Sequence, residues 1–445
     1  MQYITIFDYL LLPVYLYIFY LIVKKRSVKY TDDELRKYFF TAFFLRMFGA
    51  VAYAMLVQYY YGYGDSFVFY YGGDFLSTRV MEDLGNFRYF FKSASDVKAW
   101  YDFEIGNIGY SGYFGVGSNL FVMKISALLS FLSFNRYLII TLFFGFFSFA
   151  GLWRLFLVFK EINQGKQLKI LAWAVLYMPS IWFWGSGLIK DSVCIGGLGF
   201  IIHFLYVIFV KKQISIKNLL GLALLVYVVA TIKSYIIIVL AVSLSTFVFY
   251  KFVSPFKNLV IRTFVILVFF FSMILIALVT NFDSQLQLLA EESKVQVDAY
   301  QRNYEAVQAD DEESKGIVEA AKIDASIGGL LLYSPTAVFK CLFRPFIWES
   351  RKIFILFSAL EASLLLFCTL FLLYKFKILG FFREVFANPY LLFSFMITIL
   401  FALIIGFTTY NFGTMARYKI ILLPFFSFLL VSLYTKLLDK KSNPV

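Results

Sequence analysis

The sequence predicts an all-α membrane protein, a polytopic bundle of transmembrane helices with two large loops outside the cytoplasm. Three observations predict this class. Of the 445 residues, 61% are hydrophobic and only 16% are charged, whereas soluble domains are about half apolar and about one quarter charged. The mean hydropathy is +0.77. Long apolar segments recur along the chain and alternate with short clusters of Lys and Arg, which is typical of spans joined by loops.

Apolar segments of the length that a bilayer requires, about 20 residues, define the individual spans. The first one begins next to Met1, without a positively charged region or a small-residue cleavage site. We therefore expect a retained helix rather than a signal peptide. The eleven predicted spans are 3–23, 38–61, 137–159, 168–183, 192–210, 217–232, 235–252, 258–280, 352–374, 388–408 and 419–436.

Clusters of Lys and Arg follow every second span, and such clusters mark cytoplasmic loops. They are Lys24, Lys25, Arg26, Lys29, Arg36 and Lys37; Lys160, Lys166 and Lys169; Lys211, Lys212 and Lys217; Lys251, Lys257 and Arg262; Lys375, Lys377 and Arg383; Lys436, Lys440 and Lys441. Placing all six in the cytoplasm predicts an external N-terminus and a cytoplasmic C-terminus. The net charge of +13 thus comes from the cytoplasmic loops and does not predict nucleic acid binding. The expected partners include membrane lipids.

We expect a single transmembrane domain, 1–445, with external loops at 62–136 and 281–351. The apolar segment 120–134 tests this scheme, because counting it as a span would invert everything downstream. It carries Lys124 and follows a glycine-broken run, so we predict an amphipathic helix on the membrane surface. A re-entrant segment is the alternative. The acidic stretch 283–324 is predicted to be a solvated excursion.

The first candidate site follows the second predicted span, where the sequence reads Gly-Tyr-Gly-Asp-Ser over residues 62–66. Glycine lets the backbone turn sharply, and the carboxylate of Asp65 at a bilayer boundary can accept a proton or bind a cation. Tyr71 and Asp74 follow it and join the candidate set. The alternative role for Asp65 is that of N-cap of a surface helix.

The second candidate site is the external segment 178–191, in which proline and glycines interrupt the helix and Lys190 and Asp191 supply charge. Its alternative is an ordinary interfacial turn in which Asp191 caps the next helix.

The remaining candidates are cations on the predicted external side. Lys233 lies in a very tight hairpin, and Arg344 lies in the run Phe-Arg-Pro-Phe; either cation suits a phosphate group or simply extends toward lipid headgroups. Arg417 and Lys419 follow a glycine and lie on the predicted external side, against the positive-inside bias. Charged residues at such energetically unfavourable positions usually have a partner or a functional role.

Other polar residues carry structural interpretations. His203 is the only histidine and lies toward the cytoplasmic end of its span. The three cysteines show no metal-ligand spacing, so neither a metal site nor a disulfide framework is predicted. Arg46 and Glu361 fall inside predicted spans and suit a mutual pair or a cavity lining. Arg46 is also close enough to the inner face to extend to it.

The order of these features resembles the GT-C superfamily of integral membrane glycosyltransferases, which use polyprenyl-phosphate-linked sugars. Tyr63 to Tyr71 looks like the acidic opening of that family's first external loop, and residues 112–136 look like its second interfacial helix and the Arg-bearing entry to the next span. Pro179 to Asp191 is similar to its second acidic motif, and Arg417 resembles its distal arginine. The match covers mainly residues 38–240. It departs in the extra first helix and in lacking an Asp-X-Asp pair, so a divalent cation is possible but not supported by that motif.

The resemblance implies a hexosyl- or pentosyltransferase in the bacterial cytoplasmic membrane. The donor would be a polyprenyl-phosphate-linked sugar, and the acceptor an extracytoplasmic glycan, lipid or protein. Asp65 would be the general base, with Asp191 as the second catalytic carboxylate, and no certain cofactor is implied. The predicted substrate- and phosphate-binding residues are Lys190, Lys233, Arg344, Arg417, Lys419, Tyr71 and Asp74.

Three alternatives remain open. The same features resemble Wzy-type polysaccharide polymerases, in which external arginines are prominent. A transporter or lipid flippase would have charges midway through its helices and broken spans at that depth. A purely structural membrane subunit would not bring the candidate residues together.

Overall fold

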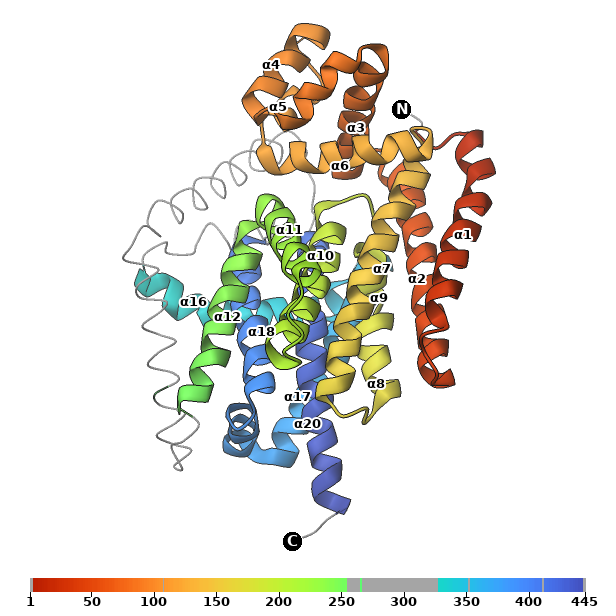
Figure 1. The fold of residues 1–445 in the computed structure, drawn as a ribbon. Helices are drawn as coiled ribbons and strands as arrows, with labels where there is room; N and C mark the ends of the chain where they lie inside the picture. The colour runs from red at the N-terminus through yellow and green to blue at the C-terminus, as the bar shows by residue number, and fades with distance from the viewer. Residues whose placement is uncertain are drawn as a thin grey trace. The chain divides into compact units, whose positions relative to one another are not determined.

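The computed structural model describes residues 3–106, 108–253, 265, 327–350, 353–409 and 412–442. Within these residues the secondary structure is helical, with no strand, which confirms the predicted all-α class (Figure 1). The chain forms two compact units, Met1–Ile237 and Ile238–Val445. We refer to them as the N-terminal and C-terminal units and describe each by itself.

The N-terminal unit is built on long apolar helices whose starts are marked by polar caps. Asp8 and Thr5 form a capping box at the start of the first helix, and Asp32 accepts hydrogen bonds from two backbone N–H groups of the second. These helices are α1 (Ile6–Ser27), α2 (Asp33–Leu56) with its π-helical extension η1 (Val57–Tyr61), α7 (Tyr137–Ile162), α10 (Lys190–Leu205) with its extension η4 (Tyr206–Val210), and α11 (Ile216–Ile232).

Contacts of α7 with its neighbours establish the relative directions of the helices. The contacts with α1 advance together along both helices, so these two are parallel: Asp8 with Leu138, Tyr15 with Phe143, and Phe19 with Phe146. The contacts with α2 run in opposite order, from Arg46 with Ser148 to Ala50 with Gly145, so α2 is antiparallel to α7.

Glycine contacts extend this pattern to α10 and α11. Ser148 and Gly151 of α7 meet Gly196 and Gly199 of α10 in the same order, so α7 and α10 are parallel. The α10–α11 contacts run in opposite order: Asp191 with Lys233, Gly197 with Val229, and Phe204 with Gly221. Since α7 and α10 point the same way, the chain between them has to return to the end where α7 begins. It does so through α8 (Leu168–Ala172), η3 (Trp173–Tyr177) and α9 (Pro179–Trp184), a path broken at Met178.

The alternating directions place the basic clusters of this unit at one end, which we call the basic end. They lie at the end of α1, the start of α2, the α7–α8 turn and the η4–α11 turn. The opposite end, the polar end, carries Asp65, Lys190, Asp191 and Lys233. This separation is the one that the charge pattern predicts for the two sides of a membrane.

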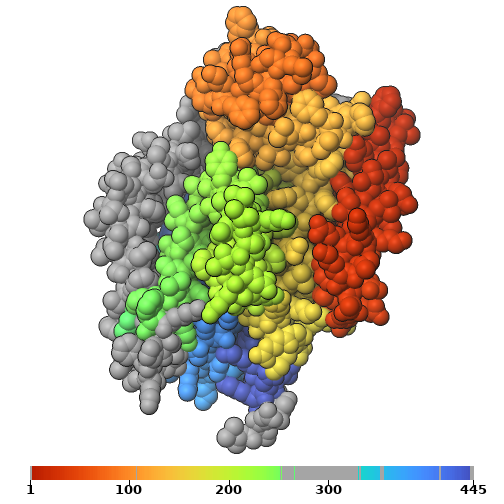
Figure 2. Space-filling view, in the orientation of Figure 1, coloured from red at the N-terminus to blue at the C-terminus, as the bar shows by residue number. Residues whose placement is uncertain are grey.

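Short helices cover the polar end (Figures 1 and 2). They are α3 (Asp65–Glu82), η2 (Leu84–Phe91), α4 (Ala94–Ile105), α5 (Ser111–Phe114) and α6 (Gly117–Ser133). Helix α6 lies crosswise to α7 in Figure 1, as expected for the predicted surface helix and not for a span. Gly72 and Gly73 of α3 have no Cβ, which lets α6 approach closely through Met123 and Ser126.

The C-terminal unit contains a second set of apolar helices, two of which deviate from a straight path. The φ of Lys377, 58°, interrupts one long helix, and a bend of 64° separates the last two helical segments. The elements are α12 (Ser234–Val253), which begins at the junction of the units, α16 (Ile327–Phe343), η5 (Ile347–Glu349), α17 (Ile353–Phe386), α18 (Pro389–Thr408), α19 (Phe412–Tyr418), η6 (Lys419–Ile421) and α20 (Leu423–Ser442).

The described residues contain six helices long and apolar enough to cross a membrane, or seven if the bent pair α19–α20 is one span. These are the features of a helical membrane protein. The predicted number of eleven spans is not confirmed. Three of the predicted segments, 168–183, 217–232 and 235–252, correspond to shorter apolar helices. The predicted span 258–280, apart from residue 265, and most of the predicted loop 281–351 lie outside the described residues.

Candidate functional site

Four of the predicted site residues come together at the polar end of the N-terminal unit. The ammonium group of Lys190 interacts electrostatically with three of them: it is attracted by Asp65 and Asp191 and repelled by Lys233. Lys190 and Asp191 open α10, Asp65 opens α3, and Lys233 is the single residue between α11 and α12. Three places that are far apart in the sequence, at 65, 190–191 and 233, therefore contribute to one group of charges.

Asp191 and Lys233 form a buried ion pair. The Lys233 Nζ lies 2.5 Å from the Asp191 Oδ1, and the side chains are 9% and 1% exposed, respectively. Lys233 therefore turns inward and does not extend toward headgroups, which corrects that alternative. The N-cap of α10 is Ile189, so Asp191 is not the N-cap either. Its side chain holds the end of α11 against the start of α10.

Lys190 links three helices at the same place. Its Nζ donates to the Ser118 Oγ of α6 at 2.8 Å and lies 6.0 Å from the centre of the Phe69 ring of α3. The side chain is half-buried. An ammonium group held by a hydroxyl and an aromatic face stays available to a negatively charged ligand.

Three helix N-termini meet around Lys190. Helices α3, α6 and α10 begin after Gly64, Val116 and Ile189, and no side-chain hydrogen bond caps any of these three starts. The first-turn N–H groups of a helix and its dipole favour negative charge. Together with two lysines, this end of the unit has the electrostatic character that a phosphate group requires.

Asp65 is the first residue of α3 and is half-buried. The N-cap is Gly64, whose φ of 135° suits glycine and not a residue with a side chain. The alternative role of Asp65 as the N-cap is therefore wrong, because Asp65 lies one position later. The helix N-terminus stabilises the ionised carboxylate. Tyr113 of α5 interacts electrostatically with Asp65, so the carboxylate lies near this short helix.

Tyr71 and Asp74 do not join this group. Asp74 is nine residues after Asp65 on α3, which puts it about 13 Å further along the helix and on the opposite face. Its carboxylate accepts hydrogen bonds from the Asn135 Nδ2 and from the Thr78 Oγ1, the latter at 3.2 Å. The Tyr71 hydroxyl lies 3.3 Å from that of Tyr101.

Asp102 ties the short helices of the polar end together. It pairs with Lys98 at 2.5 Å and accepts a hydrogen bond from the Ser111 Oγ of α5. The ammonium group of Lys98 and the Ser111 hydroxyl hold the pKa of the Asp102 carboxyl below its usual range. The Ser93 hydroxyl has the same effect on the pKa of Asp96 at the start of α4.

These carboxylates predict an acid-sensitive region. A lowered pKa in the folded state adds stability above the unfolded pKa, about 3.9 for Asp, and that stability is lost as the pH falls through the lowered pKa. We therefore expect the protection of α4 and α5 amides against hydrogen exchange to drop below about pH 4, while that of α7 stays constant. Asp102→Asn should weaken the protection already at neutral pH. Equal pH dependence in α7 would contradict the assignment.

Arg46 occupies an unexpected position. It lies at the middle of α2–η1 with 1% of its surface exposed, and its Nη1 donates to the Gly185 carbonyl at 2.8 Å and to the Ser148 Oγ at 3.0 Å. The expectation that it extends to the inner face is therefore wrong. Gly185 follows the last residue of α9, so the guanidinium binds the carbonyl end of the broken helix. A Cβ at Gly185 would overlap the guanidinium.

A second group of charges lies in the C-terminal unit. The Lys419 Nζ donates to the Arg344 carbonyl at 3.4 Å, and Lys419 is buried and interacts electrostatically with Glu361. The Arg344 guanidinium pairs with both oxygens of Glu349. Arg417 lies over the Tyr418 ring at 5.2 Å. The structure thus brings Arg344 and Lys419 together, and places Arg417 two residues from Lys419.

Sequence reasoning missed Asp8, Asn135 and Ser118. Asp8 is fully buried and accepts a hydrogen bond from the Leu138 backbone N–H at 3.1 Å. A carboxylate inside a predicted span was the available signal for Asp8. The other two are polar residues that flank the predicted surface segment 120–134, and only their partners Asp74 and Lys190 distinguish them.

Among the residues that the structure describes, no group of three or more His, Cys, Asp or Glu side chains lies in a metal-binding arrangement. No protein-family model, curated protein or solved structure matches this chain. The charged residues at the polar end are therefore the main evidence for a function.

Proposed function

We propose that this protein is a membrane glycosyltransferase that transfers a sugar from a polyprenyl-phosphate-linked donor to an extracytoplasmic acceptor. The observation that carries the proposal is the meeting of Asp65, Lys190 and the Asp191–Lys233 pair at one end of the N-terminal unit. A carboxylate beside cations and helix N-termini combines a proton acceptor with a phosphate-binding environment. The basic clusters at the other end support an external position for this group, in a bacterial cytoplasmic membrane.

The proposed reaction needs only these groups. The acceptor hydroxyl oxygen attacks the anomeric carbon of the donor sugar, and its proton passes to the Asp65 carboxylate. The bond from the anomeric carbon to the phosphate oxygen breaks, and polyprenyl phosphate leaves with the electron pair. Lys190 and the N-termini of α3, α6 and α10 stabilise the departing phosphate. The direct displacement inverts the anomeric centre.

The burial of the Asp191–Lys233 pair changes the roles proposed for these two residues. A carboxylate that is 1% exposed and bound to an ammonium group is better suited to position α10 than to take a proton from an acceptor. We therefore propose Asp65 as the base and Asp191 with Lys233 as the support of Lys190. Arg344, Arg417 and Lys419 remain proposed phosphate ligands of the C-terminal unit.

The test is transfer of a radiolabelled sugar from a synthetic polyprenyl-phosphate donor to extracted cell-envelope glycans, by the full chain in proteoliposomes. Lys190→Ala should lower kcat/KM about 10- to 100-fold, because it removes a charge-assisted hydrogen bond to the phosphate. Lys124→Ala is the control, since Lys124 lies on α6 and binds the Lys92 carbonyl instead. Equal losses in the two variants would remove Lys190 from the site.

A transporter or lipid flippase is the second candidate, and one observation favours it. Arg46 is buried at mid-span against the end of the broken helix α9, as expected where a substrate path crosses the membrane. The same proteoliposomes separate the two functions. A glycosyltransferase forms a new glycosidic bond, whereas a flippase exposes the labelled donor on the opposite leaflet and leaves it chemically unchanged.

A further inference from the structure

A pocket of about 410 Å³ lies in the C-terminal unit, between α17 and α20. Its lining combines cations with apolar side chains and includes one carboxylate. The lining includes Lys375, Arg383, Lys440, Glu384, Phe376 and Leu437.

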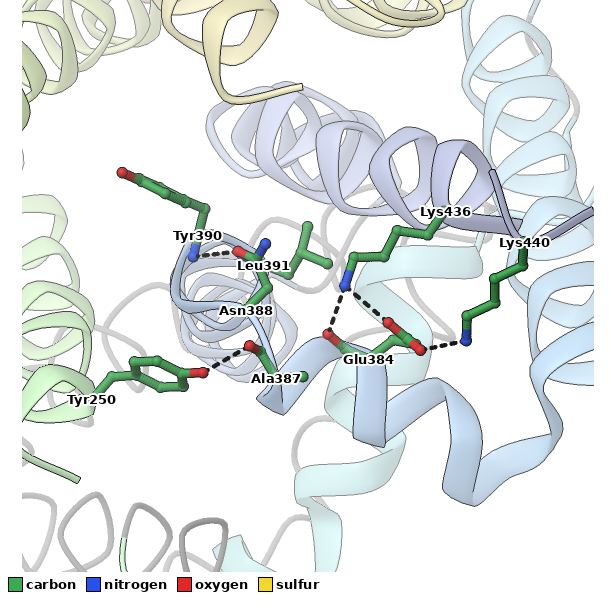
Figure 3. Close-up of polar contacts among 8 residues, drawn as sticks. All are labelled: Tyr250, Glu384, Ala387, Asn388, Tyr390, Leu391, Lys436 and Lys440. Carbon is green, nitrogen blue, oxygen red and sulfur yellow. Dashed lines mark hydrogen bonds and ion pairs between the residues drawn. The ribbon is translucent and has the colours of Figure 1, made fainter. Parts of the chain in front are cut away.

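The carboxylate in this pocket is already engaged by two lysines of α20. The Lys436 Nζ lies 2.9 Å from the Glu384 Oε2, and the Lys440 Nζ lies 2.6 Å from its Oε1 (Figure 3). The Lys440 Nζ also lies 5.3 Å from the centre of the Phe376 ring. Three cations, Lys375, Arg383 and Lys440, line the pocket together with one carboxylate, so the pocket keeps an excess of positive charge. Glu384 fixes the position of the α20 lysines and does not cancel the charge of Lys375 and Arg383.

The position of the pocket along α17 places it at a membrane boundary. Residues 353–376 are about 36 Å of helix, more than the roughly 30 Å hydrocarbon core. The φ of Lys377, 58°, then ends the straight helix. The pocket starts at Lys375, immediately before this break. Tyr374 and Leu379, which flank Lys375 and the break, are 79% and 86% exposed. Apolar side chains so exposed beside a cationic pocket suit contact with acyl chains.

We propose that this pocket binds the headgroup of an anionic phospholipid. The phosphodiester would lie between Lys375, Arg383 and Lys440, and the acyl chains would follow the exposed apolar side chains of α17. Basic pockets between transmembrane helices on the cytoplasmic side bind such headgroups. The pocket belongs to the C-terminal unit alone, and lipid binding there does not depend on glycosyl transfer.

The experiment measures lipid binding by the purified full chain in detergent, with native mass spectrometry and thermal unfolding. The probes are phosphatidylglycerol, phosphatidylcholine of the same chains, and glycerol 3-phosphate. We expect the chain to bind phosphatidylglycerol in preference to both others. Lys375→Ala with Arg383→Ala should weaken that binding about 30-fold, from about 1 kcal/mol for each cation near an anionic lipid.

The control variant is Lys25→Ala with Lys169→Ala, which removes the same charge from exposed positions of the N-terminal unit and should leave binding unchanged. Equal weakening in the two double variants would overturn the proposal in favour of diffuse attraction. Equal affinity for glycerol 3-phosphate would replace the lipid by a soluble phosphate. Lys375 and Arg383 are exposed, so their substitution should not disturb the fold. The single variant Arg383→Gln is milder and should weaken phosphatidylglycerol binding by about fivefold.

Discussion

Asp65→Asn is expected to lower the rate of sugar transfer by about 100- to 10,000-fold, the contribution of a positioned general base. Asn keeps the size and the hydrogen-bonding oxygen of the side chain but does not accept the acceptor's proton. The loss should appear in kcat, with the KM for the lipid-linked donor almost unchanged, because the phosphate is held by other groups. The measurement is initial rates of transfer in proteoliposomes.

The fold should survive this substitution. Asp65 contributes a favourable charge at the start of α3, worth about 0.3–1 kcal/mol, so the thermal unfolding temperature in detergent should hardly change. Asp96→Asn is the matched control, because Asp96 is a first-turn carboxylate of α4 at the same end of the unit and its capping role passes to Asn. Full activity in Asp65→Asn would eliminate the proposed base. Comparable loss in Asp96→Asn would indicate a general effect on the polar end.

Lys233→Met is expected to destabilise the N-terminal unit by about 3–5 kcal/mol, since it leaves the Asp191 carboxylate buried without its cation. Removing both charges, with Asp191→Asn and Lys233→Met together, should recover most of that loss. The measurement is a double-mutant cycle on the free energy of unfolding in detergent micelles. Additive effects of the two substitutions would contradict the assignment of a coupled buried pair.

The exposed pair of Lys211 and Glu161 provides the control for this cycle. Its side chains are 36% and 43% exposed, with the Nζ 2.8 Å from the Oε1, and exposed pairs contribute only about 0–1 kcal/mol. Lys211→Met should therefore change the free energy of unfolding by less than about 1 kcal/mol. The double variant at 191 and 233 should also transfer sugar more slowly than wild type even where it is stable, because Lys190 loses its support.

Local sequence patterns predicted the helices well. Apolar length marked five of the six long helices to within about five residues, whereas α17 continues to Phe386, beyond the predicted end at 374. The single residue between α11 and α12 follows from the short polar interruption at Lys233. The predicted surface segment became α6. The number of spans was harder to predict, because a segment such as 168–183 is apolar enough to cross but is broken at Met178, before the proline. Apolar composition measures preference for lipid and does not reveal where a helix stops.

The candidate site was also predicted only in part from the sequence. Position relative to the spans was enough to select Asp65, Lys190, Asp191 and Lys233, because charge at the end of an apolar segment is a local property of the chain. Helical spacing separates Asp74 and Tyr71 from Asp65, but only once α3 is known to contain all three.

Composition and charge pattern thus specified a helical membrane protein with distinct basic and polar ends. Tertiary packing alone decided that Lys233 pairs with Asp191, 42 residues away, and that Arg46 binds the Gly185 carbonyl. The physical reason is that a buried cation takes whichever oxygen the packing of neighbouring helices brings within reach. That packing depends on close glycine contacts such as Gly151 with Gly199, which join helices distant in sequence.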